Sequence, residues 1–165
     1  GFRVERAPEW RGQRVFVRHE VGGKAYELRL SEESAGTQKL MGLAAYLMTA
    51  LERGGAVVVD ELDAKLHPKL LRYVILLFKD PEVNKSGAQL IFSSQDVSTM
   101  RNDVFRRDEI WFAARGEGEA SQLWSLADIH EANGNLVSKN AAFDKQYLSG
   151  RYGADPYLTR IEEWD

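Results

Sequence analysis

Two short stretches of this sequence carry side chains suited to metal and phosphate chemistry. In the first, three valines at 57–59 run directly into Asp60 and Glu61, with Asp63 two residues further on. Carboxylate oxygens bind hard cations such as Mg²⁺, and an ionised carboxylate can accept a proton from water. An ordinary strand that ends in a solvated acidic turn would carry the same residues, so the motif needs support from its surroundings.

The second stretch is a predicted helix start made of small residues, Ser34, Gly36 and Thr37. Apolar residues then recur at helical spacing, which predicts a helix that ends at Gly54-Gly55. The free N–H groups and the dipole of a helix start can bind a phosphate, and Gly36 would let it approach the backbone. The alternative for Ser34 is a purely structural role as the N-cap.

A strand–helix–strand pattern positions the acidic stretch. The strand from Ala56 is followed by a helix that opens at His67-Pro68 and ends at Asp80-Pro81, and then by a strand over 88–92. This order predicts a parallel sheet, and the apolar run predicts a strand buried on both faces. The polar residues that follow both strands, including Gln95, should meet at one sheet edge.

The flanking segments predict scaffold elements. Alternating residues around Gly22-Gly23 and around Gly116–Gly118 predict two β-hairpins. Short helices are expected after Asp96 and over 141–148, with a loop over 127–138 between the second hairpin and the later helix. Trp111, Phe112 and Trp124 are interpreted as core or sheet-face aromatics.

Composition limits the classes of protein to consider. The 165 residues suit one domain, and the absence of cysteine excludes disulfides and thiolate metal sites. A formal charge of -3 provides no general basic field for nucleic acid. The chain contains no apolar run of membrane-spanning length and does not start with a signal peptide, so we expect a cytoplasmic protein without a membrane partner.

The order of these motifs resembles the C-terminal half of an ABC-class ATPase head. That group includes RecF, the SMC heads and the AAA-type ATPases of abortive-infection and overcoming-lysogenization systems. Ser34-Ala35-Gly36-Thr37-Gln38 looks like the signature motif, and residues 57–61 look like Walker B with its catalytic glutamate. Asp63 and His67 fall where the D-loop lies, and residues 91–96 occupy the switch segment. The resemblance runs from about Ser31 to Leu158.

The resemblance implies an α/β fold of the P-loop NTPase type, mainly a parallel sheet flanked by helices, with accessory hairpins. It implies ATP and Mg²⁺ as cofactors, with Asp60 on the metal and Glu61 activating the attacking water. It also implies that Ser34, Gly36 and Thr37 contact the nucleotide of a second copy, so that ATP holds a dimer together and hydrolysis releases it.

The sequence departs from the family pattern in three places. It contains no Gly-x-x-x-x-Gly-Lys-[Ser/Thr], so a P-loop would have to come from a missing N-terminal half, and these residues alone should be inactive. Gln95 stands where the switch usually carries His, and it can orient a water or contact the γ-phosphate but cannot carry charge. His67 stands where many relatives have Asp, and a helix-start role beside Pro68 is an equal alternative.

We therefore expect a linker and hairpin over 1–30, the signature and Walker B half of an ATPase domain over 31–158, and a tail over 159–165. Family analogy favours a DNA-linked or phage-defence switch, with DNA or a toxin or nuclease effector as further partners. Two alternatives stay open. One is a metal-dependent nuclease or phosphatase that uses the cluster around Asp60 and Glu61, and the other is a non-catalytic dimerisation module.

Overall fold

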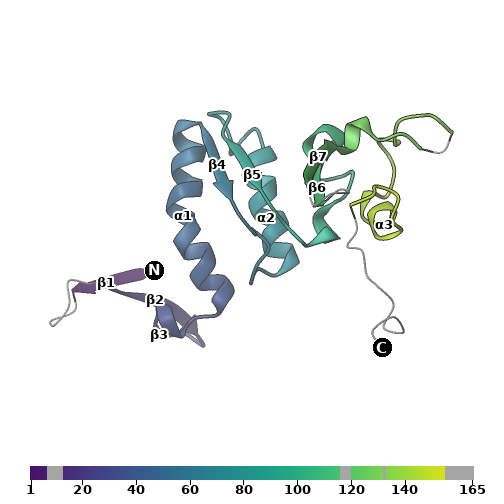
Figure 1. The fold of residues 1–165 in the computed structure, drawn as a ribbon. Helices are drawn as coiled ribbons and strands as arrows, with labels where there is room; N and C mark the ends of the chain where they lie inside the picture. The colour runs from purple at the N-terminus through teal and green to yellow at the C-terminus, as the bar shows by residue number, and fades with distance from the viewer. Residues whose placement is uncertain (7–12, 116–119, 132, 155–165) are drawn as a thin grey trace, which may run out of the picture. The chain divides into compact units, whose positions relative to one another are not determined.

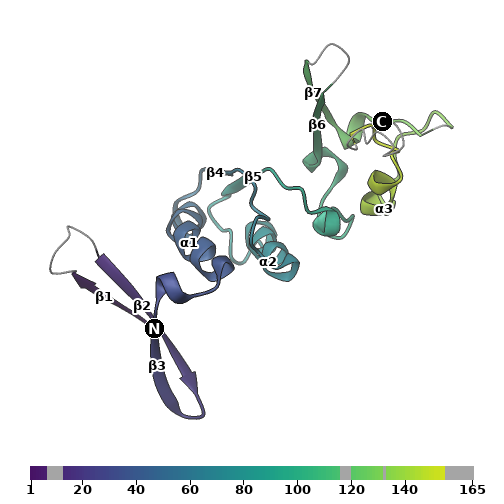
Figure 2. The same ribbon diagram turned by 60° about the horizontal axis from the view of Figure 1, so that its bottom comes forward.

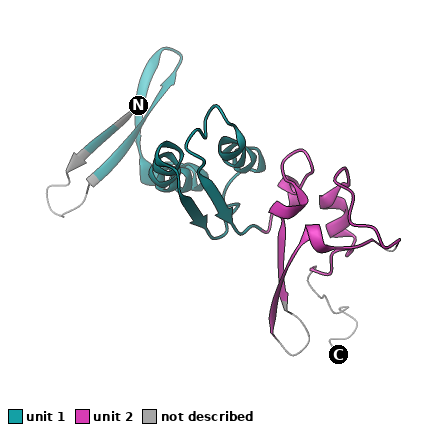
Figure 3. Cartoon of the chain, turned by 90° about the horizontal axis from the view of Figure 1, so that it is seen from above, with its two compact units in different colours: residues 1–94 teal, residues 95–165 magenta. Residues whose placement is uncertain are grey.

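The computed structural model describes residues 1–6, 13–115, 120–131 and 133–154. The chain divides into two compact units, Gly1–Ser94 and Gln95–Asp165, coloured separately in Figure 3. The boundary between them falls inside the segment 31–158 that the sequence suggests as one ATPase domain.

The first unit begins with a small antiparallel sheet in the order β1-β2-β3, made of β1 (Phe2–Arg6), β2 (Gln13–Val21) and β3 (Lys24–Arg29) (Figure 1). The predicted hairpin is confirmed as β2 and β3. Gly22 and Gly23 form its turn with φ of 58° and 75°, the left-handed conformation that glycine adopts without strain. Strand β1 was not predicted, because residues 1–30 were expected to form a linker and one hairpin.

The predicted signature helix is confirmed as α1 (Ala35–Arg53), which follows a 3-10 helix at Leu30–Glu32. Ser34 is its N-cap and Gly54 its C-cap, as the sequence indicates. Gly54 adopts a φ of 81°, which favours glycine, and its N–H bonds the Ala50 carbonyl at 2.7 Å as the last turn of the helix ends.

The predicted strand–helix–strand unit is also confirmed, as β4 (Ala56–Val59), α2 (Pro68–Lys79) and β5 (Gln89–Phe92). Strands β4 and β5 pair in parallel, with Val59 opposite Phe92 at their carboxyl ends. The side chain of Asn84 holds the return from α2 to β5, because it donates to the Phe78 and Ala88 carbonyls and accepts from the Ala88 N–H.

Both helices lie on one side of the β4–β5 pair (Figure 2). Both helices, β4 and the turn after it contribute to the buried core of the unit, which includes Leu47, Val59, Leu62, Leu71, Val74 and Ile75. The opposite face is open, with Val58 73% and Ile91 54% exposed. The expectation that the 56–59 strand is buried on both faces is therefore wrong for this chain, because no described element covers that second face.

The expectation of a mainly parallel sheet also needs correction. The described strands form three small sheets, and only the β4–β5 pair is parallel. The predicted second hairpin is confirmed as the antiparallel pair β6 (Trp111–Arg115) and β7 (Ser121–Ser125), but its turn lies outside the described residues.

The second unit also contains short 3-10 helices at Val97–Thr99, Arg107–Glu109 and Leu126–Asp128, and α3 (Phe143–Leu148). Asp96 caps the first of these, as predicted. The centroid of the Phe112 ring lies 5.3 Å from that of Tyr152, 5.7 Å from that of Tyr147 and 6.2 Å from that of Trp124. Phe112, Phe143 and Leu126 belong to the buried core of this unit. Of the three aromatics expected in the core or on a sheet face, only Trp111 is largely exposed.

Candidate functional site

The acidic residues lie directly after β4, at its carboxyl end. Asp60 and Glu61 are exposed, whereas the next residue, Leu62, is fully buried and anchors the turn in the core. Glu61 adopts a φ of 48°, in the left-handed region that costs a non-glycine residue about 1 kcal/mol. Neighbouring contacts must therefore stabilise the strained backbone conformation of Glu61, the candidate catalytic residue.

Ser93 connects the acidic turn to the end of β5. Its Oγ accepts a hydrogen bond from the Glu61 N–H at 2.7 Å and donates one to Asp60 Oδ1. Its backbone N–H bonds the Val59 carbonyl at 3.1 Å, and its carbonyl accepts the Leu62 N–H at 3.0 Å. Ser93 was not among the predicted site residues, although its position directly after the second parallel strand is a signal that could have identified it.

The start of α1 lies at the same rim as this acidic turn. The Nζ of Lys39, in the second turn of the helix, donates to the Glu61 carbonyl at 2.5 Å. Gly36 packs against the turn so closely that a Cβ atom at position 36 would come within 2.8 Å of the Lys65 carbonyl oxygen. The two stretches that the sequence suggested separately are therefore brought together.

Ser34 has the structural role that the sequence offered as an alternative to phosphate binding, since it is the N-cap of α1. Its Oγ accepts from the Thr37 N–H at 3.1 Å and lies 2.8 Å from the Thr37 hydroxyl. Ser34 is exposed and Gly36 and Thr37 are half-buried, so the helix start is not packed inside the unit. The close contact with Lys65 provides a packing reason for glycine at position 36, beside the predicted approach of a phosphate.

The two D-loop candidates occupy different environments. Asp63 is half-buried in the turn after Glu61, with a buried Oδ1. His67 is exposed and caps α2, since its Nδ1 accepts the Lys69 N–H at 3.1 Å. The helix-start role of His67 is therefore observed, and a contact with a second copy stays a prediction for both residues.

Gln95 is the first residue of the second unit, two positions after Ser93. Its predicted role in orienting water beside Glu61 stays a prediction.

Comparison with known families adds to this geometry. A family model described as "AAA domain, putative AbiEii toxin, Type IV TA system" matches residues 2–101. The chain belongs to this family of AAA domains. The match covers more than half of the chain and includes α1, β4, α2 and β5 with the residues around them. No curated protein matches the chain.

Membership in this AAA family indicates a nucleotide-binding function of the ATPase type on a P-loop NTPase-like α/β fold. Enzymes of this kind usually use Mg²⁺ with the nucleotide. Among the described residues, no group of three or more His, Cys, Asp or Glu side chains could hold a metal ion. The residues fit a metal held by one carboxylate and by substrate phosphates and water, which is how Mg²⁺ is commonly bound.

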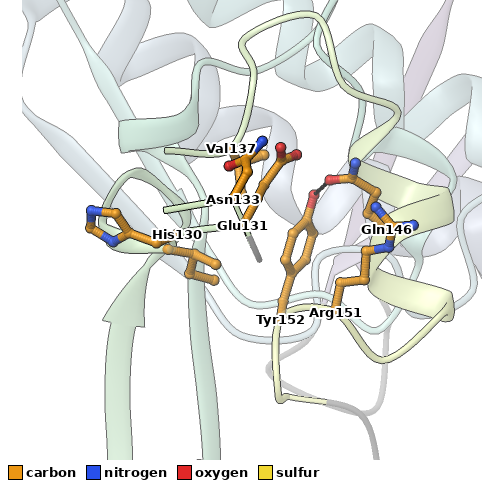
Figure 4. A pocket seen from close by; sticks show the side chains of 8 residues that line it. His130, Glu131, Asn133, Val137, Gln146, Arg151 and Tyr152 are labelled. Atoms are coloured by element: carbon orange, nitrogen blue, oxygen red, sulfur yellow. Dashed lines mark hydrogen bonds between the residues drawn. The ribbon is translucent and has the colours of Figure 1, made fainter. Parts of the chain in front are cut away.

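A pocket of about 520 Å³ lies in the second unit, with Glu131, Gln146, Arg151 and Tyr152 among its lining residues (Figure 4). The Tyr152 hydroxyl donates to Gln146 Oε1 at 2.7 Å. Burial, and then the nearby Glu131, raise the pKa of Tyr152 to about 12. None of the predicted site residues lines this pocket.

No helix in the described part of the chain has the length and apolar character needed to cross a membrane.

Proposed function

We propose that this chain supplies the signature and Walker B part of an ABC-class ATPase head that closes around ATP as a dimer. The observation that carries the proposal is the common rim formed by the start of α1 and the acidic end of β4. Lys39 and Gly36 of the helix contact the turn that contains Glu61 and Lys65, so the two stretches lie at one rim of the unit, where each would meet a different nucleotide.

In this proposal Asp60 and Glu61 have different roles in ATP hydrolysis. Asp60 would hold Mg²⁺ directly or through water, and the metal would neutralise phosphate charge. Glu61 would accept a proton from the water that attacks the γ-phosphate. Glu61 is exposed at the strand end, so its carboxylate is accessible to water and substrate. Gln95 would orient the same water by hydrogen bonding.

The helix start would act on the nucleotide of a second copy. Ser34, Gly36 and Thr37 lie in the first turn of a 19-residue helix, whose dipole favours a phosphate at that end. ATP would hold the two copies together, and hydrolysis would release them, because only ATP carries the γ-phosphate that this contact binds. Such a switch suits a DNA-linked or phage-defence role, with DNA or an effector protein as its further partner.

The P-loop would come from a segment outside these 165 residues. The exposed face of the β4–β5 pair supports this, because no described element covers it and parallel sheets are usually covered on both faces. Val58 and Ile91 present apolar side chains there. An α/β segment that carries the P-loop would add strands beside this pair and cover the exposed face.

To test this proposal, the complete reading frame that contains these residues is expressed, and ATP hydrolysis and ATP-dependent dimerisation of the purified protein are measured. We expect Glu61→Gln to keep ATP binding, reduce turnover at least about 100-fold and trap the dimer. Glu82→Gln, an exposed substitution in the α2–β5 connection, is the matched control and should leave ATP hydrolysis and dimerisation unchanged. Undiminished hydrolysis in Glu61→Gln would exclude this glutamate as the base.

The same preparation separates the two alternatives. Cleavage of DNA in Mn²⁺ without ATP would favour a nuclease that uses the Asp60 and Glu61 carboxylates. Dimerisation without any hydrolysis would favour a non-catalytic module.

A further inference from the structure

We propose that Lys39 and Ser93 are positioning residues that clamp the Glu61 peptide from two sides and thereby aim its carboxylate. This inference rests on the proposed function, in which Glu61 is the base. It assigns roles to Lys39, which follows the signature motif, and to Ser93, which lies in the switch segment where only Gln95 was given a role. Each reaches Glu61 from a different element, Lys39 from α1 and Ser93 from the end of β5.

The backbone of Glu61 needs such a clamp. Its φ of 48° is unfavourable for a residue with a side chain, and a strained conformation persists only where neighbouring contacts hold it. Ser93 Oγ accepts the Glu61 N–H, and Lys39 Nζ donates to the Glu61 carbonyl. Side chains from elsewhere in the unit therefore bond both backbone polar groups of this one residue, and its carbonyl also accepts the Ala64 N–H of the same turn at 3.0 Å.

The proton positions make Ser93 a link between the two carboxylate residues. Because its oxygen accepts from the Glu61 N–H, its single hydroxyl hydrogen is available for Asp60 Oδ1. That bond engages one Asp60 oxygen and leaves Oδ2 as the freer atom for a metal or a metal-bound water. One hydroxyl thus sets the orientation of the metal-holding carboxylate and of the peptide that carries the base.

Lys39 connects the base to the helix start. It lies two residues after Thr37, in the part of α1 proposed to meet the nucleotide of the second copy. A long charged side chain that ends on a backbone carbonyl transmits displacement of the helix start to the Glu61 peptide. The clamp therefore provides a route by which closure of the dimer would align the base in the same subunit.

Hydrogen exchange of backbone amides tests the Ser93 arm without nucleotide, in the complete protein. In Ser93→Ala the Glu61 amide loses its acceptor, and we expect its exchange to accelerate about tenfold. The Leu62 amide should be unchanged, because its acceptor is the Ser93 backbone carbonyl, which the substitution keeps. Equal exchange of the Glu61 amide in both proteins would overturn the proposal.

Kinetics test both arms. We expect Ser93→Ala and Lys39→Met each to lower kcat about tenfold or more while KM for ATP changes less than about twofold, because positioning acts on the chemical step. Ser93→Thr keeps the hydroxyl and should restore kcat, and Lys85→Met is the matched lysine control. A normal kcat in both variants, with Glu61→Gln inactive, would overturn the clamp alone. Normal hydrolysis in Glu61→Gln would instead overturn the proposed function and the clamp with it.

Discussion

Gly36 in the first turn of α1 lies directly against the Lys65 carbonyl oxygen, with room for a hydrogen atom but not for a methyl group. An added Cβ would approach that oxygen to 2.8 Å, and a backbone oxygen cannot rotate away as a side-chain end could. This contact joins the helix start to the turn after the acidic strand, so the geometry of the site depends on it.

Gly36→Ala should therefore destabilise the first unit by about 1–3 kcal/mol, because the overpacked contact forces the backbone apart. Gly42→Ala is the matched control in the same helix. Nothing lies within 4 Å of a Cβ at position 42, so this change should stabilise the helix by about 0.5–1 kcal/mol. Urea unfolding followed by far-UV circular dichroism measures both, since α1 and α2 lie in this unit. A neutral Gly36→Ala would contradict the contact.

Substitutions at Ser34 can separate capping from phosphate binding. Ser34→Ala removes the acceptor for the Thr37 N–H and should cost about 1 kcal/mol of stability. Ser34→Asp keeps a good cap and should leave stability within about 0.5 kcal/mol of the wild type. In the complete protein, however, its negative charge would face the γ-phosphate, so ATP-dependent dimerisation should be lost. An aspartate variant that still dimerises with ATP would indicate that Ser34 is only a cap.

The open sheet face predicts different results for the chain alone and for the complete protein. Val58→Thr and Ile91→Thr change exposed side chains, so each should alter the stability of the 165-residue chain by less than about 0.5 kcal/mol. If a P-loop segment covers this face, each should cost the complete protein about 1–3 kcal/mol for a buried hydroxyl.

Val59→Thr is the control for that experiment. Val59 is already buried, so this substitution should destabilise both the 165-residue chain and the complete protein. Thermal unfolding of the two forms side by side makes the comparison. Equal small effects of Val58→Thr and Ile91→Thr in both would mean that the face stays uncovered.

The raised pKa of Tyr152 predicts a loss of stability at alkaline pH. The folded state holds the phenol proton up to about pH 12, whereas the unfolded chain releases it near 10.0. The contribution of this group is therefore complete below pH about 10 and is lost as the pH rises from about 10 to about 12.

Tyr152→Phe should remove that dependence and, below pH about 10, cost about 1 kcal/mol for the lost bond to Gln146. Urea unfolding followed by tryptophan fluorescence is a suitable measurement, because the Trp124 Nε1–H donates to the Tyr152 carbonyl. The difference between wild type and Tyr152→Phe isolates this group from the other tyrosines. A difference that does not change with pH would contradict the buried phenol.

The sequence by itself determined the local elements and their ends. Helical spacing with Ser34 before and Gly54 after defined α1, and His67 with Pro68 defined the start of α2, because caps and breakers act on their own neighbours. The parallel pairing of β4 and β5 followed from the helix between them. The acidic turn and the helix start could be identified as separate motifs.

Only the tertiary structure decided how these motifs meet. The bonds of Lys39 and Ser93 to the Glu61 peptide join residues 22 and 32 positions apart, and no local pattern encodes such contacts. The exposure of Val58 could not be predicted either, because an apolar strand has the same sequence pattern whether its second face is covered or exposed. Spacing along the chain specifies which face of an element a residue occupies, whereas packing between distant elements specifies what that face touches.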